Sequence, residues 1–220
     1  MRLRIDKNSY GTILSVYAIS AVCLLACCML IKIAWLNWVL SAIFLAFSVF
    51  ITYFFRVPRR QEAGNGTLVS SVADGKVVIL EKVYEKEYLK RDCIQVSVYM
   101  DFFDVHVNFW PVTGEVTYYK YHPGRYLLAF LPKSSELNEH SSTCIKTKDG
   151  KEIFFKQIAG TFARRIVNYA EPGMQVSAGK QCGVIKFGSR IDMFLPLDAD
   201  IQVELGNYVD ACETIIASLN

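Results

Sequence analysis

The chain has 220 residues, of which 52% are hydrophobic and 20% charged, and its formal net charge is +3. Mean hydropathy is +0.24, which is high for a soluble domain, and the apolar excess lies in roughly the first quarter of the chain. The net positive charge is small and the basic residues form no stripe along the sequence, so we expect no nucleic-acid partner. The remaining residues are sufficient for one domain with a real core.

Two uncharged apolar segments, residues 11–31 and 34–55, open the chain and are joined by Lys32-Ile33. Each has about the 20 residues that a helix needs to cross a hydrocarbon core. Residues 1–60 are therefore predicted to be a two-helix transmembrane hairpin, with a hairpin embedded in one leaflet as the alternative. A signal peptide is disfavoured because a second apolar run follows the first.

Basic residues flank the hairpin at both outer ends. Arg2, Arg4 and Lys7 precede it, and Arg56, Arg59 and Arg60 follow it, whereas the connection carries only Lys32. Basic residues collect on the cytoplasmic side of a membrane. We therefore expect a protein of the cell (inner) membrane, with the second domain in the cytoplasm.

A polar linker is expected at residues 61–67, followed by a second domain over residues 68–220. Strand-like runs rich in β-branched and aromatic residues fill this domain, and Asp149-Gly150 predicts a hairpin turn. A helix is expected near Phe162–Tyr169. Turn-then-strand segments recur near residues 73, 112, 174 and 207. They favour a mainly β fold, α+β at most, with the interlocked hairpins of a lipoyl-like barrel-sandwich.

The seven cysteines share no metal-ligand spacing, which predicts that the protein holds no metal. Their odd number fits a reducing compartment. His122 and His140 lie in loop-like sequence and are expected at the surface.

Three short segments contain residues that could carry chemistry. Gly188-Ser189 lies between two strand-like runs, where strain at the glycine would weaken the peptide bond and let the Ser189 hydroxyl attack the Gly188 carbonyl. Strand alternation would place Asp104, His106 and Asn108 on one face. Asp74 precedes Gly75 in what is otherwise an ordinary turn.

Taken in order, these segments resemble the phosphatidylserine decarboxylase family, in particular its short bacterial and archaeal branch. The resemblance covers roughly residues 68–196. The matching segments are Ala73-Asp-Gly75, Phe103-Asp-Val-His-Val-Asn108, Pro111-Val-Thr-Gly114, His122-Pro-Gly124, Asn138-Glu139 and Phe187-Gly-Ser-Arg-Ile-Asp192.

The resemblance implies that the chain makes its own cofactor. Ser189 would attack the Gly188 carbonyl, and β-elimination of the resulting ester would cut the chain into residues 1–188 and 189–220. Ser189 would become a covalent pyruvoyl group that forms a Schiff base with phosphatidylserine and releases phosphatidylethanolamine, without pyridoxal phosphate or metal. The two chains would form a heterodimer at the lipid surface, with further homo-oligomerisation left open.

The resemblance also assigns roles by matched position. His106, assisted by Asp74, would activate Ser189 and later donate a proton to the carbanion. Asp104 and Asp192 are rivals for the role of Asp74. Backbone N–H groups near Gly188 should stabilise the oxyanion, although the sequence does not say which.

Candidate substrate-binding residues are Arg190, Asn108, Phe109 and Trp110. The last two stand where many relatives have a basic residue and Ala, and His140-Ser141 replaces Arg-Asn after Glu139, which puts headgroup contacts in doubt. The aromatic side chains, with Phe102 and Phe103, would contact acyl chains or pack in the core. Two alternatives stay open. One is a pyruvoyl-dependent decarboxylase of another amine, and the other is a non-catalytic, membrane-tethered barrel-sandwich module.

Overall fold

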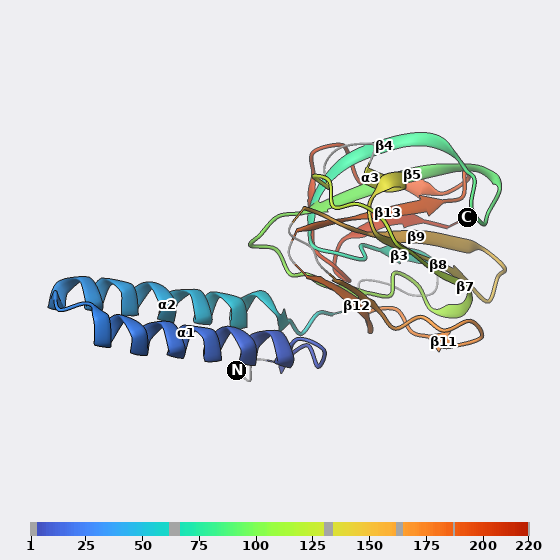
Figure 1. Ribbon diagram of the computed structural model, residues 1–220. Coiled ribbons are helices and arrows are strands. Elements are labelled where there is room, and N and C mark those ends of the chain that lie inside the picture. The colour runs from blue at the N-terminus through green and yellow to red at the C-terminus, as the bar shows by residue number, and fades with distance from the viewer. Residues whose placement is uncertain (1–3, 62–66, 130–133, 162–164, 187, 220) are drawn as a thin grey trace. The chain divides into compact units, whose positions relative to one another are not determined.

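The computed structural model describes residues 4–61, 67–129, 134–161, 165–186 and 188–219. The chain divides into two compact units, Met1–Pro58 and Arg59–Asn220. The first is a helical hairpin and the second is almost entirely β, as Figure 1 shows. The predicted fold class, a mainly β domain preceded by two apolar helices, is confirmed.

The hairpin consists of α1 (Tyr10–Leu30) and α2 (Ala34–Phe54), and β1 (Arg4–Ile5) pairs with β2 (Arg56–Val57). The Ser48 hydroxyl donates to Ser20 Oγ at 3.1 Å between the helices. Both helices are long and apolar enough to cross a membrane, and only 11% of each apolar window is buried. So much exposed apolar surface requires cover by lipid or protein.

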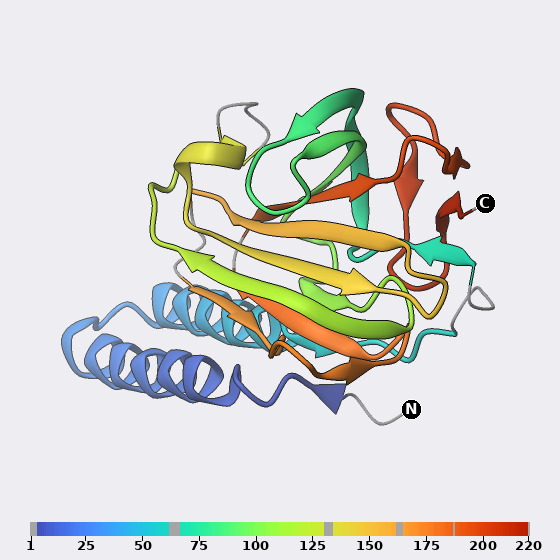
Figure 2. The same ribbon diagram turned by 90° about the vertical axis from the view of Figure 1, so that its right-hand side faces the viewer.

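The described part of the second unit forms one large antiparallel sheet, in the order β11-β7-β8-β9-β13-β5-β4-β15, and it curls as Figure 2 shows. Apolar and β-branched residues that alternate with polar ones form these strands. The strands are β4 (Gly75–Glu85), β5 (Arg91–Met100), β7 (Gly114–His122), β8 (His140–Lys146), β9 (Glu152–Ala159), β11 (Gln175–Val176), β13 (Ser189–Leu195) and β15 (Tyr208–Val209).

Two three-stranded sheets and a short helix complete the described part of this unit. One sheet has the order β14-β16-β3 and the other β10-β12-β6, and β10 and β12 contact β9 of the large sheet. The elements are β3 (Leu68–Ser70), β6 (Val107–Phe109), α3 (Ser134–Leu137), β10 (Arg165–Asn168), β12 (Gln181–Lys186), β14 (Asp200–Ile201) and β16 (Ile215–Ser218).

Strand β13 is covered on both faces, and all seven of its residues are buried. Ile191 and Met193 belong to the main hydrophobic core. Arg190 and Asp192 alternate with them and therefore point to the opposite face. The strand that begins at Ser189 thus lies at the centre of the domain.

The faint sequence repeat corresponds to two matching strand pairs. β15 pairs with the start of β4, where Val209 lies opposite Gly75. β11 pairs in the same way with the start of β7, where Val176 lies opposite Gly114. A late segment of the chain thus completes each early hairpin, as expected for interlocked hairpins.

The predicted helix near Phe162–Tyr169 is wrong where the structure describes it. Residues 162–164 lie outside the described part, and Arg165–Asn168 form strand β10, which pairs with β12. Ile166 lies opposite Ile185, and such β-branched residues fit a paired strand better than a helix. The turn predicted at Asp149-Gly150 does connect β8 and β9, with Gly150 at φ +80°. Of the expected linker at 61–67, residues 62–66 lie outside the described residues.

Candidate active site

Ser189 lies where several strand ends meet. It begins β13 and pairs with Met100, the last residue of β5, and with Ala159, the last residue of β9. Its hydroxyl is fully buried against the Met100 sulfur at 3.8 Å. β4 starts beside the end of β5, so Asp74 lies at the same edge of the sheet. The topology therefore gathers the predicted residues at one edge.

Gly188 precedes Ser189 with φ +69°, in the left-handed region that a residue with a Cβ adopts at a cost. Phe187 lies outside the described residues. The Gly188 carbonyl oxygen accepts a 3.0 Å hydrogen bond from the backbone N–H of Gly160, directly after β9. The strained glycine expected from the sequence is therefore present, and a backbone donor lies at its carbonyl.

His106 is fully buried in the loop before β6. Its Nε2 accepts a 3.0 Å hydrogen bond from the Gly188 N–H. Because Nε2 accepts, Nδ1 carries the proton, and it donates to the Asp104 carbonyl oxygen at 3.0 Å. The imidazole is thus neutral in this arrangement, and its basic nitrogen faces the Gly188-Ser189 segment.

The expectation that Asp104, His106 and Asn108 share a strand face is wrong. Strand β6 covers only Val107–Phe109, and Asp104 lies in a turn where its carboxylate accepts the Asp101 N–H at 2.8 Å. The turn interrupts the two-residue alternation on which the expectation depended. Asp104 contacts His106 through its backbone instead.

Asp74 uses its two carboxylate oxygens differently. Oδ1 accepts the Ala211 N–H at 2.8 Å, and Oδ2 accepts the Arg60 guanidinium at 2.6 Å. The first contact has a counterpart in the repeat, where Thr113 Oγ1 accepts the Ala178 N–H at 3.0 Å. Oδ1 therefore holds a backbone N–H in place, as the Thr113 hydroxyl does in the other repeat. Oδ2, which pairs with Arg60, is the oxygen that this structural contact does not use.

Burial raises the pKa of the Asp74 carboxyl to about 6, although the Ala211 N–H and the Arg60 guanidinium both favour the carboxylate. The described partners of Asp74 are thus Arg60 and Ala211 rather than His106. Asp74, His106 and Ser189 lie at one edge of the sheet, and the hydrogen bonds described for them run to Arg60, Ala211, Gly188, Asp104 and Met100 rather than along the chain of a catalytic triad.

The sequence model of the family described as phosphatidylserine decarboxylase matches residues 47–217. The chain belongs to the phosphatidylserine decarboxylase family. Relatives named phosphatidylserine decarboxylase proenzyme come from Amoebophilus asiaticus and Cytophaga hutchinsonii. They are 50% and 44% identical over 171 and 167 residues, covering 78% and 76% of this chain and 76% of each relative. The relative from Porphyromonas gingivalis is 37% identical over 219 residues, which is 99% of both chains.

Membership in the phosphatidylserine decarboxylase family confirms the resemblance seen in the sequence and makes the chain a decarboxylase. Many curated relatives carry the same name, so this conclusion does not depend on a single match.

Arg190 is a buried residue of the decarboxylase with a carboxylate partner. Its Nε lies 2.8 Å from Asp192 Oδ1, and both side chains are fully buried. Its other nitrogens donate to the Ala129 carbonyl oxygen at 3.0 Å and to the Ser135 hydroxyl. Asp192, a rival for the role of Asp74, is thus paired with Arg190 on the sheet face opposite the core. A substrate-binding role for Arg190 would require an exchange of this partner.

The other three candidate substrate-binding residues are buried. Asn108 accepts the Gln157 amide at 2.7 Å, and the Trp110 ring packs edge-on against Phe155 with centroids 6.2 Å apart. Phe109 is 3% exposed, whereas Phe103 is 72% exposed. Of the two interpretations of the aromatic cluster, core packing fits the side chains of Phe109 and Trp110.

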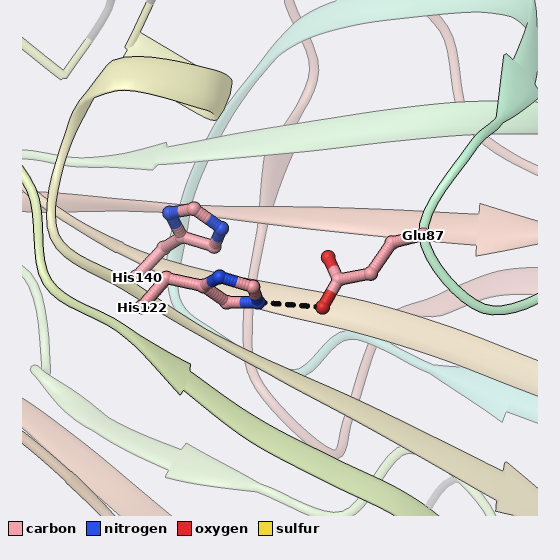
Figure 3. A group of neighbouring side chains, drawn as sticks. All are labelled: Glu87, His122 and His140. Carbon is pink, nitrogen blue, oxygen red and sulfur yellow. Dashed lines mark hydrogen bonds and ion pairs between the residues drawn. The ribbon is translucent and has the colours of Figure 1, made fainter.

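Sequence reasoning missed a polar cluster formed by Glu87, His122 and His140 (Figure 3). His122 Nε2 bonds Glu87 Oε1 at 2.6 Å, and the two imidazole rings stack with centroids 4.4 Å apart. His140 was expected at the surface but is buried, because it begins β8 opposite His122 at the end of β7. The only signal in the sequence was the pair of histidines flanking one hairpin.

The Glu87–His122–His140 cluster has the ligand types of a transition-metal site, and its ligand atoms lie within 4.8 Å of one another. However, Glu87 Oε2 also lies 3.0 Å from the Lys156 ammonium and accepts the Ser142 hydroxyl. Burial alone would raise the pKa of Glu87, but Lys156 and the hydrogen bonds lower it to about 2. Lys156 already supplies the positive charge, so the cluster is best described as an ion-pair network beside a cavity of about 790 Å³.

Proposed function

We propose that the protein decarboxylates phosphatidylserine to phosphatidylethanolamine, using a pyruvoyl group made from Ser189. The observation that carries this proposal is the setting of the Gly188-Ser189 segment. A glycine at φ +69° lies between a buried imidazole and a backbone N–H donor, immediately before a buried serine. This arrangement fits an internal acyl transfer, for which a basic nitrogen and an oxyanion donor are both needed.

The self-cleavage begins when Ser189 Oγ bonds to the Gly188 carbonyl carbon. The carbon–nitrogen bond breaks, and the hydroxyl proton ends on the Ser189 nitrogen, which gives an ester. Loss of the Ser189 Cα proton then breaks the Oγ–Cβ bond and frees the Gly188 carboxylate. One water hydrolyses the remaining enamine to ammonia and the pyruvoyl group. His106 is the proposed proton carrier, because its Nε2 is a base already directed at this segment.

Decarboxylation uses the pyruvoyl carbonyl, which takes up the substrate amine and accepts the electrons released with carbon dioxide. Because the pyruvoyl group would be made from Ser189 itself, it would lie where Ser189 lies: fully buried, at the edge of the sheet where His106 and Asp74 also lie. His106 is also the proposed donor of the proton that replaces the lost carboxyl. Asp74 is proposed to support the positive charge on this imidazole.

The cleaved product would remain a heterodimer of residues 1–188 and 189–220. Three strands of the smaller chain pair with strands of the larger one: β13 with β5 and β9, β15 with β4, and β16 with β3. These pairings are antiparallel ladders and need no covalent connection at Gly188.

The larger chain would keep the apolar hairpin, which we propose crosses the cell membrane with the catalytic domain on the cytoplasmic side. A lipid substrate gives this anchor a direct purpose. The basic residues that flank both outer ends of the hairpin support this orientation.

Denaturing mass spectrometry of the purified full chain tests the self-cleavage. We expect two fragments that divide between Gly188 and Ser189, whereas Ser189→Ala should remain an intact chain. Ser97→Ala, which alters another fully buried serine of the same sheet, should cleave normally. An intact wild-type chain with unmodified Ser189 would contradict the proposal.

Detergent-solubilised enzyme should then release carbon dioxide from carboxyl-labelled phosphatidylserine but not from free serine. Release from free serine at an equal rate would instead indicate a soluble amine as the substrate.

A further inference from the structure

The peptide bond between Ala159 and Gly160 connects two hydrogen bonds. Its N–H donates to the Gly188 carbonyl oxygen at 3.0 Å. Its C=O, on the other side of the same peptide plane, accepts the side-chain amide of Asn138 at 2.7 Å. Both contacts act on one amide, so the Asn138 hydrogen bond polarises the N–H that faces Gly188.

Asn138 is fully buried and held by further contacts of its side chain. Its Oδ1 accepts the Leu127 N–H at 2.9 Å, and its Nδ2 also donates to the Leu127 carbonyl oxygen at 2.8 Å. All the hydrogen-bonding groups of this amide are therefore engaged. An amide fixed in this way has one orientation, which directs its donor at the Ala159 carbonyl.

Gly124 lets its own segment of the chain pack directly against the Asn138 backbone. A Cβ on Gly124 would lie 2.4 Å from the Asn138 carbonyl carbon, so only glycine permits this close approach. The next residue, Arg125, accepts the Glu139 N–H at 2.9 Å, and Glu139 in turn accepts the Ala159 N–H at 2.9 Å. Gly124 and Asn138-Glu139, which belong to two segments of the family resemblance, therefore position the same peptide bond.

Gly160 is restricted by the group that it contacts. A Cβ at this position would lie 2.4 Å from the Gly188 carbonyl oxygen and 3.0 Å from its carbon. Its φ lies outside the left-handed region, so an alanine here would be opposed by that contact rather than by backbone strain. The absence of a side chain thus leaves the N–H next to the carbonyl that Ser189 must attack.

We propose that the Gly160 N–H is the oxyanion donor for self-cleavage and that Asn138 is its positioning residue, an inference that rests on the proposed function. When Ser189 Oγ adds to the Gly188 carbon, the double bond becomes single and its oxygen gains the negative charge. The Gly160 N–H then holds an anion in a buried site. Loss of one such donor typically slows acyl transfer about 10²- to 10³-fold.

The test compares self-cleavage rates of the full chain, followed by gel and mass spectrometry after synthesis. Gly160→Ala and Asn138→Asp should both slow cleavage, the first by about 10²-fold or more. Asn138→Asp keeps the size of the side chain and the acceptor for Leu127 but removes the donor to Ala159.

Asn168→Asp is the matched control for Asn138→Asp. Asn168 also accepts a backbone N–H, that of Ala170, and its amide donates to Ser141, Thr143 and Gln157. We expect this control to cleave faster than Asn138→Asp even if both variants have the same melting temperature. Equal slowing of the two variants would overturn the role of Asn138, and a wild-type rate in Gly160→Ala would overturn the role of Gly160.

Hydroxylamine identifies the affected step, which a merely structural defect would not select. It cleaves an accumulated ester, so it should leave the rate of both slow variants unchanged if acyl transfer is the step that they lose. Acceleration by hydroxylamine would place the defect in elimination and overturn the proposal. A wild-type chain that never cleaves would instead remove the proposed function itself, and this inference with it.

Discussion

The Gly188 N–H donates a 3.0 Å hydrogen bond to Nε2 of His106, although the two residues lie 82 positions apart. The contact directs the basic nitrogen of the imidazole at the residue whose carbonyl Ser189 must reach. The same histidine is fixed from its other side by the Asp104 carbonyl oxygen. Its tautomer and orientation are therefore set before any proton moves.

His106→Gln should greatly lower the rate of self-cleavage, while its side chain still offers a hydrogen-bond acceptor to the Gly188 N–H. Glutamine cannot carry the proton of the Ser189 hydroxyl, and loss of a general base costs about 10²- to 10⁴-fold in rate. The measurement is the fraction of cut chain over time. His122→Gln, at a histidine outside the candidate site, should cleave at the wild-type rate. Normal cleavage by His106→Gln would rule out proton transfer by His106.

The self-cleavage rate should rise with pH through about 6, the pKa to which burial raises the Asp74 carboxyl. The ionised form needed to support an imidazolium predominates only above that pKa. Arg60→Gln removes a positive charge 2.6 Å from Asp74 and should therefore move the midpoint to higher pH. The measurement is the cleavage rate of the full chain across a pH series.

Arg59→Gln removes the same charge from an exposed neighbour and should leave this midpoint in place. Asp74→Asn should hold the rate near the value that the wild type has well below pH 6, and so remove the step. An unchanged profile in Arg60→Gln would show that Asp74 is not the group that titrates.

Glu87→Gln should destabilise the domain near neutral pH, because the Lys156 ammonium would lose the carboxylate 3.0 Å away and keep only that of Glu85, at 4.0 Å. The pKa of Glu87 is lowered to about 2 in the folded protein from 4.5 in the unfolded chain. The stabilisation that the Glu87 carboxylate contributes is thus complete at pH values above the pKa of the unfolded chain. It is lost as pH falls toward the pKa of the folded protein. The loss in unfolding free energy should be on the order of 2 kcal/mol near pH 7.

Denaturant unfolding over a pH series measures this difference for Glu87→Gln. The gap between wild type and variant should shrink as pH falls from about 5 toward about 2. Glu204→Gln, at an exposed position, should unfold like the wild type throughout. A gap that does not depend on pH would show that the network stabilises by packing rather than by charge.

Trp110→Ala should lower the unfolding free energy by about 3–5 kcal/mol, because it leaves a cavity beside Phe155. Phe103→Ala should change it by less than about 0.5 kcal/mol, since that ring is 72% exposed. Denaturant unfolding in detergent separates the two. A stable Trp110→Ala with a raised KM for phosphatidylserine would favour a lipid contact at Trp110 over core packing.

Local patterns in the sequence were sufficient for the fold class and for most of its elements. The two apolar segments gave the helices to within one residue at each end, because backbone groups bonded within a helix need no distant partner. The turn at Asp149-Gly150 and the repeated turn-then-strand segments gave the β hairpins. The prediction near Phe162–Tyr169 failed because pairing with β12 determines that segment, and no local pattern reveals a partner so far along the chain.

For the candidate site, the sequence by itself determined which residue types are present. Ser189, His106 and Asp74 were identified through the family resemblance, and their roles stay predictions. Only the tertiary structure decided their partners: His106 with Gly188, Asp74 with Arg60, and the Gly188 carbonyl with Gly160. A backbone N–H such as that of Gly160 is common to every residue except proline, so no sequence pattern marks the one that faces a reacting carbonyl. Its role depends on the register of β9 beside β13, which the fold as a whole sets.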